Sequence, residues 1–115
     1  MPLEKHPAVY ILANLYRSTM YVGVTSDLWQ RVWDHKNKRY DGFSAEYGLN
    51  NLVWYEHHHF MPDAINREKL LKRWHRDWKF RIIEELNPHW RDLHDKIDPV
   101  ASLVAIKAGP RPSTG

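Results

Sequence analysis

The sequence predicts an α+β fold, in which a three-stranded, mainly antiparallel sheet is flanked by helices. Two short β-prone runs at 9–12 and 20–24 are separated by a polar turn and so predict a hairpin, and a third run at 52–60 predicts another strand. Helix-capping residues and helical periodicity follow the second and third runs. We expect strands at about 7–13, 20–25 and 51–60, and helices near 27–39, 63–77 and 79–86.

The helix expected at 27–39 begins directly after a capping sequence at 25–27. One face of this helix carries, at i, i+3, i+4 and i+7 spacing, Leu28, Arg31, Val32 and His35. An arginine and a histidine therefore lie within a stripe that should be apolar. This departure makes the hairpin and its following helix the first place to look for chemistry.

The second predicted helix has Pro62 at its first turn, where a missing N–H group is tolerated. One face of this helix carries Ala64, Glu68, Leu71 and His75. A further helix follows at 79–86 and ends at Asn87, before Pro88. One more short helix is expected within 90–97.

The bulk composition is that of one compact domain. The chain has 115 residues, 43% of them hydrophobic, and no cysteine, which excludes disulfides and thiolate metal sites. No apolar run approaches the roughly 18 residues of a membrane span, and the N-terminus lacks the core of a signal peptide. We therefore expect a cytoplasmic protein with no membrane partner, a domain at 1–97 and a weakly ordered, proline-rich tail at 98–115.

The charge is unevenly distributed, although the net charge is only +3. Segment 67–81 has seven basic and two acidic residues and a net charge of +5, whereas 82–98 has a net charge of −3. The basic segment has two interpretations, a solvated helix face or a contact for the phosphate backbone of a nucleic acid. The candidate nucleic-acid-binding residues are Lys36, Lys38, Arg39, Arg67, Lys69, Lys72, Arg73 and Arg76.

Six side chains are singled out as candidates by the family resemblance described in the next paragraph, although each has a purely structural alternative. A strand tyrosine is commonly a buried core residue, Arg31 has a helical partner in Asp27, and Glu68 has one in Lys72. An asparagine before proline is commonly a helix C-cap. The six candidates are Tyr10, Tyr21, Arg31, His35, Glu68 and Asn87.

The spacing of these residues resembles the GIY-YIG nuclease family. The sequence AVYIL is followed, eleven residues after its tyrosine, by YVG, and Arg31 and His35 come one helical turn apart on the next helix. Glu68 within NREKLLKRW and Asn87 within ELNPHWRDL match the metal-binding glutamate and the late asparagine of that family. The series most resembles small stand-alone members, which are related to the nuclease modules of the bacterial excision-repair incision subunit and of phage homing endonucleases.

The resemblance covers about residues 8–97, with two departures. Ala8 replaces the first glycine of the family pattern and Val22 an isoleucine. Neither position needs a functional side chain. The fold that the resemblance implies agrees with the one predicted from periodicity.

The resemblance implies a metal-dependent endonuclease that hydrolyses nucleic acid, with DNA favoured over RNA. DNA repair is one pathway that it fits, beside mobile elements and defence. One tyrosine would take a proton from the attacking water; the resemblance does not decide which, and we favour Tyr10. Arg31 and His35 would contact the phosphate, and Glu68 would be the single protein ligand of Mg²⁺ or Mn²⁺. The alternatives are a catalytically weak or inactive nucleic-acid-binding module of the same fold and a protein-interaction domain.

Substrate choice is expected to follow nucleic-acid structure rather than sequence. The chain has no room for a separate DNA-reading domain, and contacts from a basic helix position a phosphate backbone without reading bases. A homodimer or a protein partner would be needed to supply recognition of a particular sequence.

Overall fold

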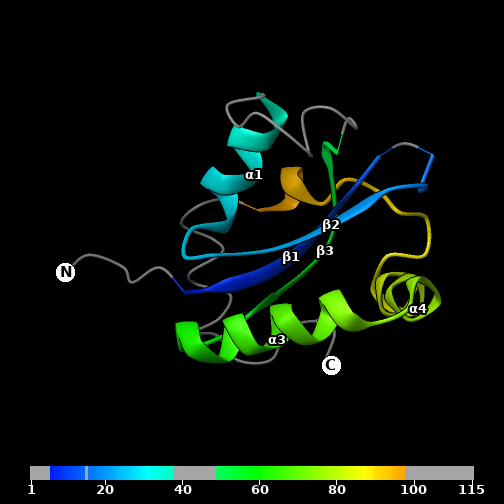
Figure 1. Cartoon of the computed structure of the whole chain (residues 1–115). Helices are drawn as coiled ribbons and strands as arrows, with labels where there is room; N and C mark the ends of the chain where they lie inside the picture. The colour runs from blue at the N-terminus through cyan, green and yellow to red at the C-terminus, as the bar shows by residue number, and fades with distance from the viewer. Residues whose placement is uncertain (1–5, 15, 38–48, 98–115) are drawn as a thin grey trace.

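The fold is a three-stranded antiparallel sheet with helices against both faces (Figure 1). The computed structural model describes residues 6–14, 16–37 and 49–97. Along the chain the elements are β1 (Ala8–Ala13), β2 (Met20–Thr25), α1 (Leu28–Lys36), β3 (Asn51–His57), α3 (Met61–Arg73), α4 (Arg76–Leu86) and the 3₁₀ helix η1 (His94–Lys96). The strand order is β2-β1-β3, which places β1 at the centre. The predicted α+β class is confirmed.

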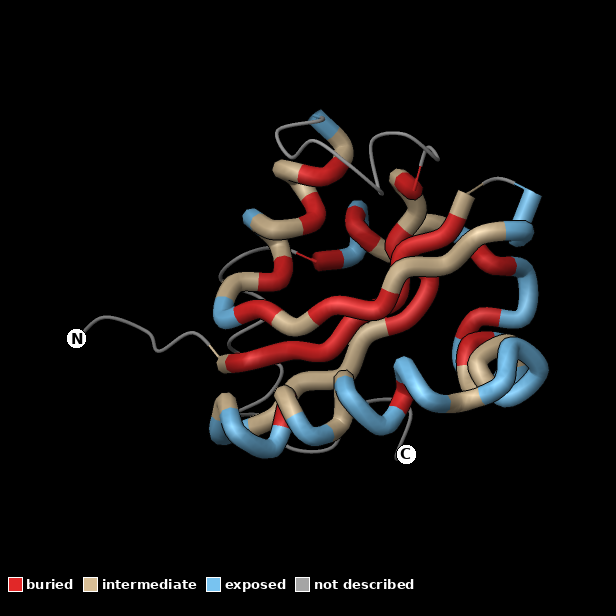
Figure 2. The backbone as a smooth tube through the Cα atoms, in the orientation of Figure 1, coloured by how far each residue is buried: buried red, intermediate tan, exposed pale blue. Residues whose placement is uncertain are grey.

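Strand β1 is buried along its whole length (Figure 2). Its side chains alternate between the two faces of the sheet, as they must in an extended strand. Ala8, Tyr10 and Leu12 point to one side, and Val9 and Ile11 to the other. Because both faces are covered, the strand is an apolar run instead of an alternation of apolar and polar residues.

The first face of the sheet packs against α1. Leu28 and Val32 of this helix share a core with Tyr10 and Leu12, and Ile97 from the end of the described chain completes it. The helix begins as predicted, since Asp27 is the N-cap and its carboxylate accepts a hydrogen bond from the backbone N–H of residue 30 at 3.3 Å.

The second face packs against α3 and α4. Ala64, Leu71 and Ile83 of these helices bury themselves against Val9 and Ile11 of β1. The expected proline in the first turn of α3 is confirmed. The helices therefore form two layers, one on each side of the sheet, as Figure 1 shows for α1 and α3.

The pairing between β1 and β3 contains a one-residue irregularity. Ile11 pairs with Trp54 and Leu12 with Leu52, which leaves Val53 without a partner in the register. Val53 and Trp54 both contribute to the core beneath α3 and α4, although they are consecutive. A bulge of this kind lets two successive side chains point to the same face.

Three predicted boundaries are wrong. Strand β3 ends at His57 and not at residue 60, because the backbone at Phe60 already forms the N-cap of α3. Helix α1 ends at Lys36, before residue 39. The break between α3 and α4 lies at Trp74 and His75, not at residue 78, so His75 leaves the shared face proposed for α3.

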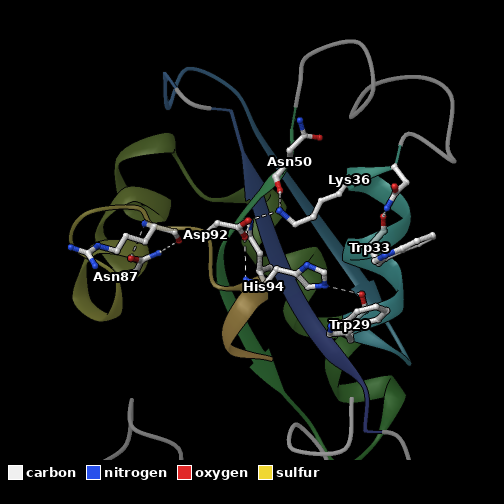
Figure 3. A network of polar contacts seen from close by, with 10 residues as sticks. Trp29, Trp33, Lys36, Asn50, Asn87, Asp92 and His94 are labelled. Carbon is white, nitrogen blue, oxygen red and sulfur yellow. Dashed lines mark hydrogen bonds and ion pairs between the residues drawn. The ribbon is translucent and has the colours of Figure 1, made fainter. Parts of the chain in front are cut away.

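The segment after α4 is tied back onto α1 and β3 through Asp92 (Figure 3). One carboxylate oxygen of Asp92 accepts hydrogen bonds from the backbone N–H groups of Leu52 and His94, both at 3.1 Å, and the other pairs with Lys36. Lys36 also donates to the carbonyl of Asn50 at 2.9 Å. The imidazole of His94 lies 3.2 Å from the carbonyl oxygen of Trp29. The expected short helix within 90–97 is present as η1.

Two expectations fall outside the described residues. These are the weakly ordered tail at 98–115 and the contacts expected of Lys38 and Arg39. None of the described helices is long and apolar enough to span a membrane.

Replacing Asp92 with alanine should destabilise the fold by about 2 to 3 kcal/mol, because charge-assisted hydrogen bonds are lost and the N–H of Leu52 is left without its partner. Chemical denaturation of both proteins would measure the difference in the free energy of unfolding. Asp95→Ala is the matched control, since this exposed neighbour belongs to η1. Equal stability of the two variants would contradict the role given to Asp92.

Candidate active site

Tyr10, Tyr21 and His35 converge on the face of the sheet that α1 covers. In the antiparallel register Tyr10 lies opposite Gly23 and Tyr21 opposite Leu12, so both phenol rings project to the same side. The ring centroids of the two tyrosines are 6.2 Å apart, and His35 lies 6.1 Å from Tyr10 and 5.5 Å from Tyr21. The hydroxyl of Tyr10 is 3.3 Å from Nε2 of His35. The sheet and α1 therefore bring three candidate residues into one group.

Gly23 provides the space that Tyr10 occupies. A Cβ atom at this position would lie 2.5 Å from both Cζ and the hydroxyl oxygen of Tyr10. Any side chain at residue 23 would therefore displace the phenol. Gly23 was not among the residues that we singled out from the sequence, although a glycine inside a strand is a recognised sign of close approach.

His35 is held in its neutral form by its surroundings. Burial lowers the pKa of His35 below its ordinary value of 6.5, and the positive charge of Arg31 lowers it further. The carboxylate of Asp34 acts in the opposite direction. A neutral imidazole at pH 7 has one nitrogen free of a proton, so His35 can accept a hydrogen bond or a proton there.

The two tyrosines differ in how accessible they are. Tyr10 is completely buried, whereas Tyr21 is partly exposed on β2, which is an edge strand. Water can therefore reach Tyr21 more readily than Tyr10. This geometry favours Tyr21 over our earlier choice of Tyr10 as the group that meets a water molecule.

Glu68 lies on α3, against the opposite face from the tyrosines. Successive helical residues are about 100° apart, so Arg67 and Glu68 flank the buried stripe formed by Ala64 and Leu71 on its two sides. Nε of Arg67 donates to a carboxylate oxygen of Glu56 on β3 at 3.1 Å. The Glu68 flank therefore faces the β2 edge, because α3 packs on β1 and β2.

Glu68 has the chemistry of a cation ligand. Its carboxylate is 2.7 Å from Nζ of Lys72, so a positive charge already lies beside it, and the lysine side chain is 53% exposed and free to swing into solvent. In the described ranges, at Glu68 or anywhere else, no three histidine, aspartate or glutamate side chains gather as metal ligands. The Glu68 side chain is itself only 14% exposed, so a dication held by this one carboxylate would take its other ligands from water and substrate.

Asn87 is a structural anchor in this geometry, and the structure does not bring it to the tyrosines. Its Nδ2 donates to the carbonyls of Val53 and Arg91 at 3.1 and 2.8 Å, and its Oδ1 accepts from the N–H of Arg91 at 3.0 Å. The residue is also the C-cap of α4, as its sequence context indicated. Asn87 thus fixes the end of α4 to β3, at the edge of the sheet opposite β2.

Three of the basic residues predicted to bind nucleic acid are occupied within the protein. Lys36 pairs with Asp92, and Arg67 bonds to Glu56. Arg76 donates to the carbonyls of Arg17 and Ser18 in the turn between β1 and β2. The other predicted residues that the structure describes lie exposed on α3, namely Lys69, Lys72 and Arg73, and of these Lys72 is paired with Glu68.

Replacing Asp34 with asparagine should lower the pKa of His35 further, since the charge that opposes burial and Arg31 is removed. An NMR titration of the imidazole signals would measure the change. Asp95→Asn is the matched control, because Asp95 raises the pKa of His94 and should leave His35 unaffected. A His35 that titrates at or above 6.5 in the parent protein would contradict its described environment.

Comparison with known proteins agrees with the motif spacing. The family model described as the GIY-YIG catalytic domain matches residues 6–81, which include β1, β2, α1, β3 and α3. No curated protein and no solved structure matches the chain. The match covers more than half of the sequence, and it includes both tyrosines, Arg31, His35 and Glu68. The chain therefore belongs to the GIY-YIG family, whose domain is of the nuclease type.

Proposed function

We propose that this protein is a metal-dependent endonuclease that hydrolyses phosphodiester bonds of nucleic acid, DNA rather than RNA. The observation that carries the proposal is the group formed by Tyr10, Tyr21 and His35. A buried hydroxyl at hydrogen-bond distance from a histidine held neutral is an arrangement that orients and moves protons.

In this proposal Tyr21 meets the attacking water, because it is the accessible phenol on the edge strand. The Tyr21 hydroxyl would take the water proton as it gives its own proton to neutral His35, which is the final base. Buried Tyr10 fixes the imidazole through its hydroxyl. The water oxygen forms a bond to phosphorus as the bond to the leaving oxygen breaks, and that oxygen takes a proton from solvent.

Arg31 would bind the phosphate at which this substitution occurs. It lies on α1 one turn before His35, close enough for its charge to lower the pKa of that residue. A guanidinium group offers two parallel donors to phosphate oxygens, and this contact strengthens as negative charge develops on them. Arg31 would therefore act more on the chemical step than on binding.

Glu68 would hold Mg²⁺ or Mn²⁺, and Lys72 would swing away when the ion binds. When bound, such an ion polarises a phosphate oxygen. Because Glu68 lies on the β2 flank of α3, the substrate would contact both faces of the sheet around its β2 edge. Water and substrate would reach Tyr21 from this same edge.

Tyr21→Phe should slow the nicking of supercoiled plasmid in the presence of magnesium by about a hundredfold or more, because the hydroxyl that relays the water proton to His35 is lost. Initial rates from gel electrophoresis would measure the effect. Tyr16→Phe is the matched control, since Tyr16 is 86% exposed in the turn between β1 and β2. A parent protein that binds DNA without cutting it would identify an inactive binding module instead.

Glu68→Gln should abolish the broadening of backbone amide NMR signals around residue 68 that Mn²⁺ is expected to cause in the parent protein. Lys72→Met should make Mn²⁺ bind more tightly, because the competing positive charge is removed. Glu85→Gln is the control for an exposed glutamate on α4. Broadening that is the same in Glu68→Gln and the parent protein would remove Glu68 as the ligand.

A further inference from the structure

One tryptophan is left on the surface of the protein, at the junction of α3 and α4. All six tryptophans lie within the described residues, and Trp78 alone is classed as exposed, with 54% of its surface accessible. A large apolar ring on the surface costs hydrophobic free energy that burial would recover. Neither the hydrolytic group nor the fold described above uses this exposed ring.

The Trp78 ring is supported from beneath by a series of fixed side chains. Its ring packs edge-on against Trp74, with 5.6 Å between centroids and an interplanar angle of 76°. Trp74 is partly buried, and the guanidinium carbon of Arg67 lies 5.5 Å from its centroid. Arg67 is in turn held by Glu56 on β3. The exposed ring therefore rests on a support that extends to the sheet.

Basic residues come before and after this ring along the chain, although Asp77 beside it adds one negative charge. Arg73 is exposed at the end of α3, directly before Trp74, and Arg81 is exposed one turn after Trp78 on the same helix. Neither arginine is used in the contacts that hold the fold together as described above. Two exposed arginines near Trp78 in the sequence could attract a phosphate chain that passed over this junction.

The junction lies at the end of the sheet that carries Tyr21. Arg76, two residues before Trp78, donates to the carbonyl of Arg17 at 3.1 Å and to that of Ser18. Strand β2 begins directly after this turn, and Tyr21 is its second residue. Figure 2 colours most residues of α3 and α4 around this junction as exposed.

We propose that Trp78 is a stacking platform for an unpaired base of the nucleic acid, with Arg73 and Arg81 on the neighbouring phosphates. This inference rests on the proposed function for its substrate class, and adds a preference for single-stranded segments. An exposed aromatic ring beside cations is the combination that binds single strands, because every base has a flat face to stack. A base within a duplex is already stacked on its neighbours and does not offer that face.

The test is binding of a short fluorescent oligonucleotide, single-stranded or annealed to its complement, measured by anisotropy in EDTA at low salt. Trp78→Ala should weaken single-strand binding by about 5- to 100-fold and change duplex binding little. Trp78→Phe should retain most of the affinity. Leu86→Ala removes another exposed apolar side chain from α4 and should have no effect.

A strand in which the bases are replaced by abasic positions separates stacking from phosphate attraction. It should bind the parent protein as weakly as the ordinary strand binds Trp78→Ala, and it should not distinguish the two proteins. Unchanged single-strand binding in a folded Trp78→Ala variant would overturn the inference, as would an equal loss for duplex. Loss of a concentration-dependent dimer in that variant would also overturn it, by assigning Trp78 to a contact between copies.

These outcomes are independent of catalysis, because binding is measured without a metal ion. Plasmid nicking by the parent protein with unchanged binding in Trp78→Ala would remove the stacking site and leave the proposed nuclease intact. Selective loss of single-strand binding without any nicking by the parent protein would support the stacking site and remove the proposed hydrolysis.

Discussion

The complete burial of β1 is the constraint on which the rest of the structure depends. A central strand whose six residues are all buried requires cover on both faces, and α1 supplies one cover while α3 and α4 supply the other. The strand carries one polar side chain, that of Tyr10, and a buried hydroxyl must find a partner within the protein. His35 on α1 is that partner. Covering the sheet and assembling the candidate active site are therefore the same packing event.

Much of the fold could be predicted because its elements are specified locally. The signals are the β-prone apolar runs, the capping carboxylate of Asp27 and the proline in the first turn of α3, and all act within a few residues of where they stand. The break at Trp74 and His75 has no such signal, since neither glycine nor proline is nearby. It is set by the packing of Trp74 against the core and against Arg67, which a single helical periodicity does not reveal.

The residues of the candidate site also fall into two groups, those placed by local sequence and those placed by distant contacts. Tyr10, Tyr21 and His35 come from a hairpin and the helix directly after it, so the spacing along the chain already determines their proximity. The position of Glu68 depends on how α3 is rotated about its axis above the sheet. The hydrogen bond between Arg67 and Glu56 fixes that rotation. Lys36 is not available to a ligand because it is ion-paired with Asp92, which is 56 residues away in the sequence. Partners at that separation leave no pattern in a single sequence.

The basic segment 67–81 shows why charge alone is a poor guide to a binding surface. Arg67 donates to a carboxylate and Arg76 to backbone carbonyls. Both contacts position the junction of α3 and α4. Arg67 also lies against the ring of Trp74, on which the Trp78 ring packs, while Arg76 joins the junction to the turn before β2. The residues that remain exposed beside them are then available to a phosphate chain. A cation that fixes the fold and a cation that contacts substrate can thus be neighbours in sequence, and only the three-dimensional contacts distinguish them.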